Sequence, residues 1–296
     1  MLENYLPEII FVLLLAILIY FFFNWFCRCN TNEKQYCSYT YGDTDGPHTW
    51  KYRFQIRGEN QSPINILSVC SIVIPSETVA PLDFTVEYHT TPQEMKIVND
   101  GHTVVIYSSW SGGRKPIICG GPLCDEYKLF SMRFRWGPND EEGSEHMIDM
   151  RRYAMELQVT FNKCSCRCTD ISKSVRSCAV VIISYMFEIT NADNPFLETI
   201  MYALRYIQTP CKSYSMKPLP ISLIAPMFTR RYFSYLGSLT HPPCTEGVRW
   251  IIQPEPLSVS VYQVRQFRKL MGFCGPILTN TRPVQNANNR DVIFYE

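Results

Sequence analysis

Short apolar runs separated by turn residues fill the chain from about residue 37 to its end. Turn-rich stretches such as 42–47 and 109–116 flank runs such as HTVVIYSSW and MELQVTF, in which apolar residues alternate or are β-branched. Such runs are typical of strands bounded by turns. One helix is expected at 259–271, where apolar residues recur at helical spacing. We therefore predict one mainly β domain at 37–296, with few short helices and no internal linker.

The composition fits a folded domain without a strong charge bias. Of the 296 residues, 46% are hydrophobic and 19% are charged, which argues against a disordered chain. The 28 Lys and Arg nearly balance the 27 Asp and Glu, so the formal net charge is +1. Nucleic-acid binding is therefore not expected, because it usually needs a basic excess.

The N-terminus carries a hydrophobic segment. As a helix, residues 9–26 would cover close to the ~30 Å hydrocarbon core of a bilayer. A cleaved signal peptide is the alternative, but Glu3 and Glu8 precede the segment in place of basic residues, and no small-residue cleavage site follows it. We predict an uncleaved signal-anchor helix within residues 1–29 and a short tether at 30–36. The protein would then be a single-pass membrane protein.

The flanks of this segment give only a weak indication of orientation. Arg28 and Lys34 lie on its C-terminal side, and the positive-inside tendency would leave the globular domain in the cytosol. Two cations are weak evidence for orientation, and long domains are translocated largely regardless of charge. The side of the membrane on which the domain lies stays open.

Ten motifs in the domain, taken together and in this order, resemble the α-class carbonic anhydrases. They are TYGDTDGPHTW (40–50), GENQSPINI (58–66), VNDGH (98–102), CGGPLCDEYKL (119–129), FRWG (134–137), GSEHMIDMRRYAMELQVTF (143–161), YFSYLGSLTHPPC (232–244), VRWIIQPEPLSVS (248–260), FRKL (267–270) and NTRPVQNANNR (280–290). The resemblance implies a large, twisted, mostly antiparallel sheet with a conical cavity. It also implies hydration of carbon dioxide at a zinc ion held by three His imidazoles.

All three zinc-ligand positions of that family carry other residues here. Residues i and i+2 of a strand face the same side, so the strand at 131–136 presents Arg133 and Arg135 where the family has its two neighbouring His. Gln158, on the next strand, stands where the third His belongs. A guanidinium keeps its proton and offers no lone pair to a metal. We therefore predict that the chain holds no zinc or other cofactor and resembles the catalytically inactive carbonic anhydrase-related proteins.

The histidines of the chain do not offer a replacement metal site. The five are His48, His89, His102, His146 and His241, and no two are close in sequence. His102 matches the family's proton-shuttle position, and His146 matches a position with a structural role. A hydrogen-bonded or solvent-facing His is a more probable interpretation of each than a ligand.

The residues that surround the zinc ligands in the family are nevertheless present. Glu145 matches the residue that orients a gatekeeping threonine, Thr240 matches that threonine, and Glu156 matches the carboxylate behind the third ligand. Buried carboxylates need compensation, so we expect Arg133 and Arg135 to pair with them in an ionic core. The alternative is an anion-binding pocket. The resemblance places the remaining cavity residues at Tyr41, Ser131, His241, Val248 and Trp250.

The thirteen cysteines leave disulfide pairing open. Cys244 matches a position that is disulfide-bonded in many secreted relatives, but Ile56 stands where the partner cysteine is expected. The missing bridge favours a reducing location. The C-x-C-x-C run at 164–168, with Cys178 downstream, does not have a usual zinc-site spacing.

Three functions remain compatible with the sequence. We favour a membrane-anchored, catalytically inactive module that binds an unidentified protein partner. The first alternative is a residual or atypical carbonic anhydrase that still hydrates carbon dioxide. The second is a module that binds an anion or a sulfated glycan through the Arg-lined cavity. Nothing in the sequence indicates an oligomeric state.

The mature protein is expected to retain residues 9–26, because the acidic N-terminus and the missing cleavage site are both unfavourable for signal-peptide removal. N-terminal sequencing of protein isolated from membranes checks this expectation. An N-terminus ahead of residue 9 agrees with an anchor, whereas one beyond residue 26 contradicts it.

Overall fold

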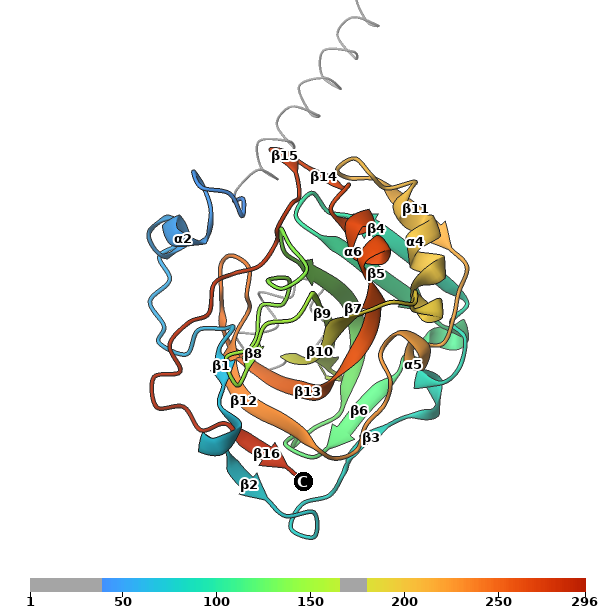
Figure 1. The fold of residues 1–296 in the computed structure, drawn as a ribbon. Helices are drawn as coiled ribbons and strands as arrows, with labels where there is room; N and C mark the ends of the chain where they lie inside the picture. Colours follow the sequence, from blue (N-terminus) through green and yellow to red (C-terminus); the bar gives the residue numbers. More distant parts are fainter. Residues whose placement is uncertain (1–38, 166–179) are drawn as a thin grey trace, which may run out of the picture. The chain divides into compact units, whose positions relative to one another are not determined.

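A twisted sheet of twelve strands dominates the computed structural model, which describes residues 39–165 and 180–296 (Figure 1). Ten of these strands follow one another in the order β11-β4-β5-β7-β9-β10-β13-β12-β16-β2, and β6 joins β3 to β7. Neighbours are antiparallel except for the pairs β10–β13 and β16–β2. The prediction of a mainly β, mostly antiparallel sheet is confirmed.

The strands of this sheet vary in length from three to fifteen residues. Their bounds are β2 Ile72–Ile74, β3 Leu82–Phe84, β4 Glu94–Asn99, β5 Val104–Ser109, β6 Ile117–Gly120, β7 Tyr127–Trp136, β9 Met155–Lys163, β10 Val180–Thr190, β11 Ser213–Met216, β12 Tyr232–Ser238, β13 Glu246–Ser260 and β16 Ile293–Tyr295. Two small two-stranded sheets accompany it, formed by β1 Asn65–Ile66 with β8 Met147–Ile148 and by β14 Met271–Gly272 with β15 Gly275–Pro276.

The α-helices of the described residues are short, as expected. They are α2 Pro47–Arg53, α4 Glu198–Leu204, α5 Ile221–Ile224 and α6 Val261–Phe267. The helix predicted at 259–271 is shorter than expected, because β13 continues to Ser260. There the Ser260 hydroxyl accepts a hydrogen bond from Gln263 N (3.1 Å), which starts α6 with a capping box.

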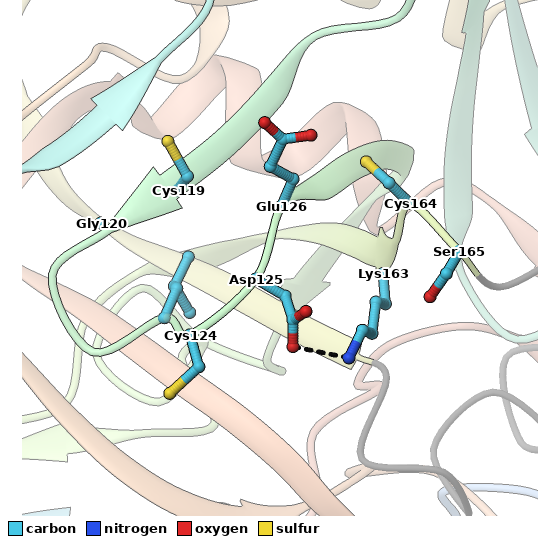
Figure 2. A pocket seen from close by; sticks show the side chains of 9 residues that line it. Cys119, Gly120, Cys124, Asp125, Glu126, Lys163, Cys164 and Ser165 are labelled. Carbon is cyan, nitrogen blue, oxygen red and sulfur yellow. Dashed lines mark hydrogen bonds and ion pairs between the residues drawn. The ribbon is translucent and has the colours of Figure 1, made fainter.

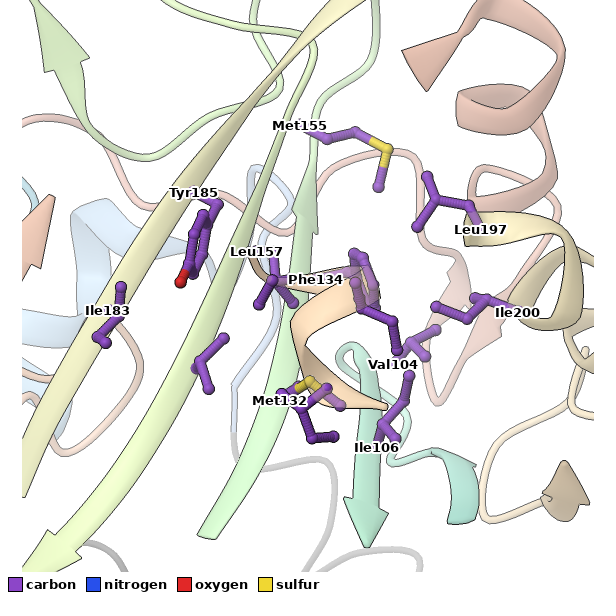
Figure 3. Close-up of a cluster of buried hydrophobic side chains, with 14 of the residues drawn as sticks. Val104, Ile106, Met132, Phe134, Met155, Leu157, Ile183, Tyr185, Leu197 and Ile200 are labelled. Carbon is purple, nitrogen blue, oxygen red and sulfur yellow. The ribbon is translucent and has the colours of Figure 1, made fainter. Parts of the chain in front are cut away.

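One face of the sheet packs into the main hydrophobic core. Met132 and Phe134 of β7 and Leu157 of β9 are at most 1% exposed and point into it. Figure 3 shows them with side chains of β5 and β10, while Ile200 of α4 covers the cluster from the other side. The alternation predicted for these strands is therefore correct, and it fixes which residues face away from this core.

The opposite face carries a second, smaller apolar cluster. It includes Ile182 of β10, Tyr235 of β12, and Val248 and Trp250 of β13, all buried. Arg133 and Arg135 lie out of phase with Met132 and Phe134 on β7, so they project toward this second face. The candidate site therefore lies on the second face of the sheet.

The predicted membrane segment lies outside the described residues, as does the predicted tether at 30–36. Residues 40–296 form one compact unit. Within the two described ranges, no helix is long and apolar enough to cross a membrane.

Candidate functional site

Strands β7 and β9 bring the three predicted ligand positions together. The antiparallel register pairs Arg133 with Gln158 and Arg135 with Glu156. Residues 133 and 135 share one face of β7, and residues 156 and 158 share one face of β9. The positions predicted from separate motifs therefore lie side by side on one face of the sheet.

Arg135 is the buried cation at the centre of the site. Its side chain is 2% exposed, and its Nε lies 3.3 Å from Glu145 Oε2, whose side chain is fully buried. The guanidinium also donates hydrogen bonds to oxygens from four parts of the chain, namely Gln158 Oε1 (3.2 Å), Tyr41 Oη (2.9 Å), Thr240 Oγ1 (3.3 Å) and the Asn280 carbonyl (3.3 Å). The expected ion pair of Arg135 with Glu145 is present.

Glu145 is held by donors besides Arg135. Its Oε2 accepts a hydrogen bond from Gln158 Nε2 (2.7 Å), and its Oε1 accepts one from the backbone N–H of Arg282 (2.9 Å). Burial raises the pKa of this carboxyl, and the positive charge of Arg135 acts in the opposite direction. Gln158 thus lies between Arg135 and Glu145, accepting from one and donating to the other.

Glu156 pairs with a histidine, so the expectation that an arginine would compensate it is wrong. Its Oε1 lies 2.9 Å from Nδ1 of His146, and its Oε2 accepts from the backbone N–H of Glu145 (2.8 Å) and of His146 (2.9 Å). Gln158 and the Ser184 hydroxyl donate to Oε1 as well, at 3.0 and 2.8 Å. These donors occupy both oxygens, which is why Glu156 needs no arginine.

The pKa of Glu156 follows from this environment. Burial by itself raises the pKa of the carboxyl. The charge of His146 and the hydrogen bonds from His146 and Gln158 outweigh burial and lower the pKa to about 2. Glu156 is therefore ionised at neutral pH.

Arg133 differs from Arg135 in its surroundings. It is only half-buried, and its Nη1 donates a hydrogen bond to Ser131 Oγ (3.2 Å). Among the described residues, no carboxylate lies within ion-pairing distance of its guanidinium. The expected pairing with Glu145 or Glu156 is wrong for this arginine, because their oxygens are taken up by Arg135, His146 and backbone donors.

His241 is kept neutral beside the two arginines. Burial and the positive charges of Arg133 and Arg135 lower its pKa to about 3. Its Nδ1 lies 3.1 Å from the carbonyl oxygen of Pro242. An uncharged imidazole in this place adds no positive charge to the site.

The other predicted cavity residues have varied surroundings. The ring of His102 packs edge-on against Phe273, with centroids 5.6 Å apart. Val248 and Trp250 were expected to line the cavity but have no exposed surface, because both belong to the second apolar cluster. The indole Nε1 of Trp250 donates to the carbonyl of Ser238 (3.0 Å).

Sequence reasoning missed Asn280, which holds the loop after β15 against β7. This residue is fully buried, its Oδ1 accepts from Trp136 N (2.8 Å), and its Nδ2 donates to Thr103 Oγ1 (3.0 Å). Its carbonyl oxygen is the one that Arg135 contacts. No periodic pattern marks a loop residue of this kind, and only its place at the start of the motif at 280–290 could have drawn attention to it.

A zinc ion does not fit this donor set. The residues at the three ligand positions offer two guanidinium groups without lone pairs and one amide, whereas zinc takes imidazole, thiolate or carboxylate ligands. The side chain of Arg135 also fills hydrogen-bonding positions around Glu145 and Thr240. Across residues 39–165 and 180–296, no three or more His, Cys, Asp or Glu gather where they could hold a metal ion.

Three cysteines line a separate surface pocket of about 480 Å³ (Figure 2). They are Cys119, Cys124 and Cys164, and Lys163 pairs with Asp125 beside them at 2.6 Å. Burial raises the pKa of the Cys119 and Cys164 thiols, which makes them poor nucleophiles and metal ligands. Cys166 and Cys168, the other cysteines of the C-x-C-x-C run, and Cys178 lie outside the described residues.

Cys244 lies apart from that pocket, in the loop after β12. It is buried as a free thiol, and burial raises its pKa to about 11.

Comparison with known proteins identifies the family. The sequence model of the eukaryotic-type carbonic anhydrases matches residues 45–296. The chain belongs to the carbonic anhydrase family. It is 32% identical to "Carbonic anhydrase 1" of Mus musculus over 85% of this chain and 96% of the mouse protein. It is 33% identical to "Carbonic anhydrase 1" of Oryctolagus cuniculus over 79% and 98%, and 31% identical to "Carbonic anhydrase 7" of Mus musculus over 78% and 85%.

In this carbonic anhydrase relative, Arg135→Leu is expected to lower the free energy of unfolding by about 3–5 kcal/mol, because it leaves Glu145 buried without its cation. Arg133→Leu is the matched control on the same strand. It removes one hydrogen bond and should cost only about 0.5–1.5 kcal/mol. Chemical denaturation of the two variants measures the difference. Equal midpoints for the two variants would contradict the ionic core.

The ionisation of Glu156 predicts a pH dependence. Its pKa is depressed in the folded state, so the stability it contributes is present above the unfolded value of 4.5 and is lost as pH falls toward about 2. Glu156→Gln should therefore destabilise the protein by roughly 3 kcal/mol at pH 7, and by progressively less as pH is lowered from 4.5. Denaturation of both proteins at several pH values tests this. A difference that does not change with pH would argue against it.

Proposed function

We propose that this chain is a catalytically inactive carbonic anhydrase relative that binds no zinc. The observation that carries the proposal is the position of Arg135. It occupies one ligand position on β7, is almost fully buried and pairs with Glu145. A fixed cation at this point and a divalent cation a few ångströms away would repel each other strongly.

The charge balance of the site supports the same proposal. In the family's enzymes, a zinc ion would compensate the carboxylates at the centre of the domain. Here Glu145 and Glu156 have protein partners, Arg135 for the first and His146 for the second. The carboxylates therefore need no metal to stay buried, in keeping with the preference of buried charges for paired, hydrogen-bonded environments.

A protein of this kind would act through binding. The apolar segment at 9–26 supports a single-pass membrane anchor, and the balanced charge argues against nucleic acid as a partner. We propose that the domain is held at a membrane and binds a protein partner there.

Arg133 supports anion binding in the cavity as a second function. Its guanidinium is half-exposed, makes one hydrogen bond to Ser131 and has no ion-pairing carboxylate among the described residues. The neutral ring of His241 lies near enough to Arg133 for the arginine's charge to lower its pKa, so a ligand could meet both a cation and a neutral hydrogen-bonding group there. A sulfate or a sulfated glycan has suitable chemistry. Arg133→Gln would separate this role from folding, because Arg133 is outside the buried network.

Zinc content and activity test the main proposal. The purified full-length protein is expected to contain less than one equivalent of zinc by elemental analysis and to hydrate carbon dioxide no faster than buffer. This follows because two of its three ligand positions hold guanidinium groups. One equivalent of zinc together with inhibitor-sensitive hydration would overturn the proposal and favour the atypical enzyme.

The variant Arg133→His/Arg135→His/Gln158→His serves as the converse experiment. It restores three imidazoles but removes the cation beside Glu145. We expect it to be unstable with chelator and to recover when zinc is added, because metal binding then compensates the carboxylate. A variant that is equally stable with and without zinc would show that the backbone no longer supports the ligand geometry.

A further inference from the structure

Arg282 is a buried cation without a carboxylate partner. The residue is 5% exposed, and its Nη1 donates to Gln61 Oε1 (2.9 Å) and to the Ser62 carbonyl (2.8 Å). Its Nε is buried and has no hydrogen-bond partner. In the described part of the chain, no Asp or Glu lies within ion-pairing distance of this guanidinium.

Such an arrangement is unusual because buried arginines are nearly always paired. Glu246 is linked to the guanidinium through Gln61, whose Oε1 accepts from Nη1 and whose Nε2 donates to Glu246 Oε1 (2.8 Å). Nη1 is therefore satisfied, whereas the opposite edge of the guanidinium, made of Nε and Nη2, has no protein acceptor. Nε is closed off from solvent, so Nη2 is the group of this edge that can donate to a carboxylate oxygen of a ligand.

Arg282 lines a cavity of about 810 Å³, which is within the size range of small-molecule sites. Helix α2 contributes His48 and Lys51 to one wall, and the loop that follows Arg282 contributes Gln285 and Asn289 to another. Figure 1 shows α2 and this C-terminal loop, in dark red, on the same side of the domain. Segments from the two ends of the domain thus build one site.

The chemistry of the wall indicates what the cavity would hold. Arg282 and Lys51 carry positive charge, His48 offers ring nitrogens, and Glu59 is the acidic residue among the lining side chains. The amides of Gln285 and Asn289 can both donate to and accept from hydroxyl groups. The wall therefore combines a buried cation, Arg282, with amide groups that can hydrogen-bond the uncharged, hydroxyl-bearing part of a ligand.

We propose that this cavity binds a small carboxylic acid that carries hydroxyl groups, with its carboxylate accepting a hydrogen bond from Nη2 of Arg282. Lys51 adds positive charge at the rim, and the amides hold the hydroxyl groups. The site is distinct from the Arg135 network, to which Arg282 contributes only its backbone N–H through Glu145. This proposal goes beyond the proposed function and does not depend on whether the protein binds zinc.

Titration of the purified full-length protein with D-glucuronate tests the proposal, with D-glucose as the uncharged control. Calorimetry or ligand-observed NMR should show saturable binding of one glucuronate per chain and none of glucose. Arg282→Lys keeps the charge but removes the Nη2 donor and should weaken binding by about tenfold or more. Lys51→Glu should also weaken binding, whereas Lys217→Glu, an exposed change outside the cavity, should not.

The Arg282→Lys and Lys51→Glu variants test the proposal independently of each other. Arg282→Lys also disturbs the bonds to Gln61 and Ser62, so its melting temperature is measured in parallel. If it fails to fold, Lys51→Glu carries the test, because Lys51 is exposed on α2 and makes none of these bonds. Absence of saturable glucuronate binding, equal binding of glucose, or unchanged affinity in Lys51→Glu would each overturn the proposal. Displacement of glucuronate by phosphate at a lower concentration would overturn the carboxylate assignment.

Discussion

The ion pair between Arg135 and Glu145 determines how the centre of this domain is built. Glu145 is fully buried, so its negative charge requires a nearby cation, and Arg135 supplies it at 3.3 Å. The guanidinium then reaches Tyr41 near the start of the domain, Thr240 after β12 and the Asn280 carbonyl in the C-terminal loop. One side chain thereby ties together segments that are far apart in the sequence. Removing it would leave several acceptors and one carboxylate unsatisfied at once.

The two arginines of β7 show that burial, not residue type, decides their roles. They are two positions apart on one face of the strand, yet Arg135 is almost fully buried and ion-paired while Arg133 is half-buried with one neutral hydrogen bond. Glu156 needs neither arginine as a partner, because His146 and backbone donors already stabilise it. The site is thus an ionic core on one side and an accessible cation on the other. These two features support different functions for the two arginines.

Much of this arrangement follows from strand periodicity, and the rest depends on tertiary contacts. Alternation on β7 and β9 was enough to predict which residues face the core, whereas the resemblance to the carbonic anhydrases implied that Arg133, Arg135 and Gln158 come together. The partner of Glu156 could not be derived this way, because it depends on how the turn before β8 presents His146. Asn280 and Arg282 come from a loop without periodicity, so their burial and contacts were not visible in the sequence. Helix α6 was placed correctly but predicted too long at both ends. A capping box makes Ser260 its N-cap, and the helix ends at Phe267.

A double-mutant cycle on Arg135 and Glu145 tests the central claim most directly. Chemical denaturation of Arg135→Leu, Glu145→Leu and the double variant gives the coupling energy between the two side chains. An ionic core predicts that the double variant is more stable than the sum of the single losses by at least about 1 kcal/mol, because each single change leaves a buried charge that the double change removes. Additive losses, with no coupling between the two positions, would contradict the claim that this pair forms an ionic core at the centre of the domain.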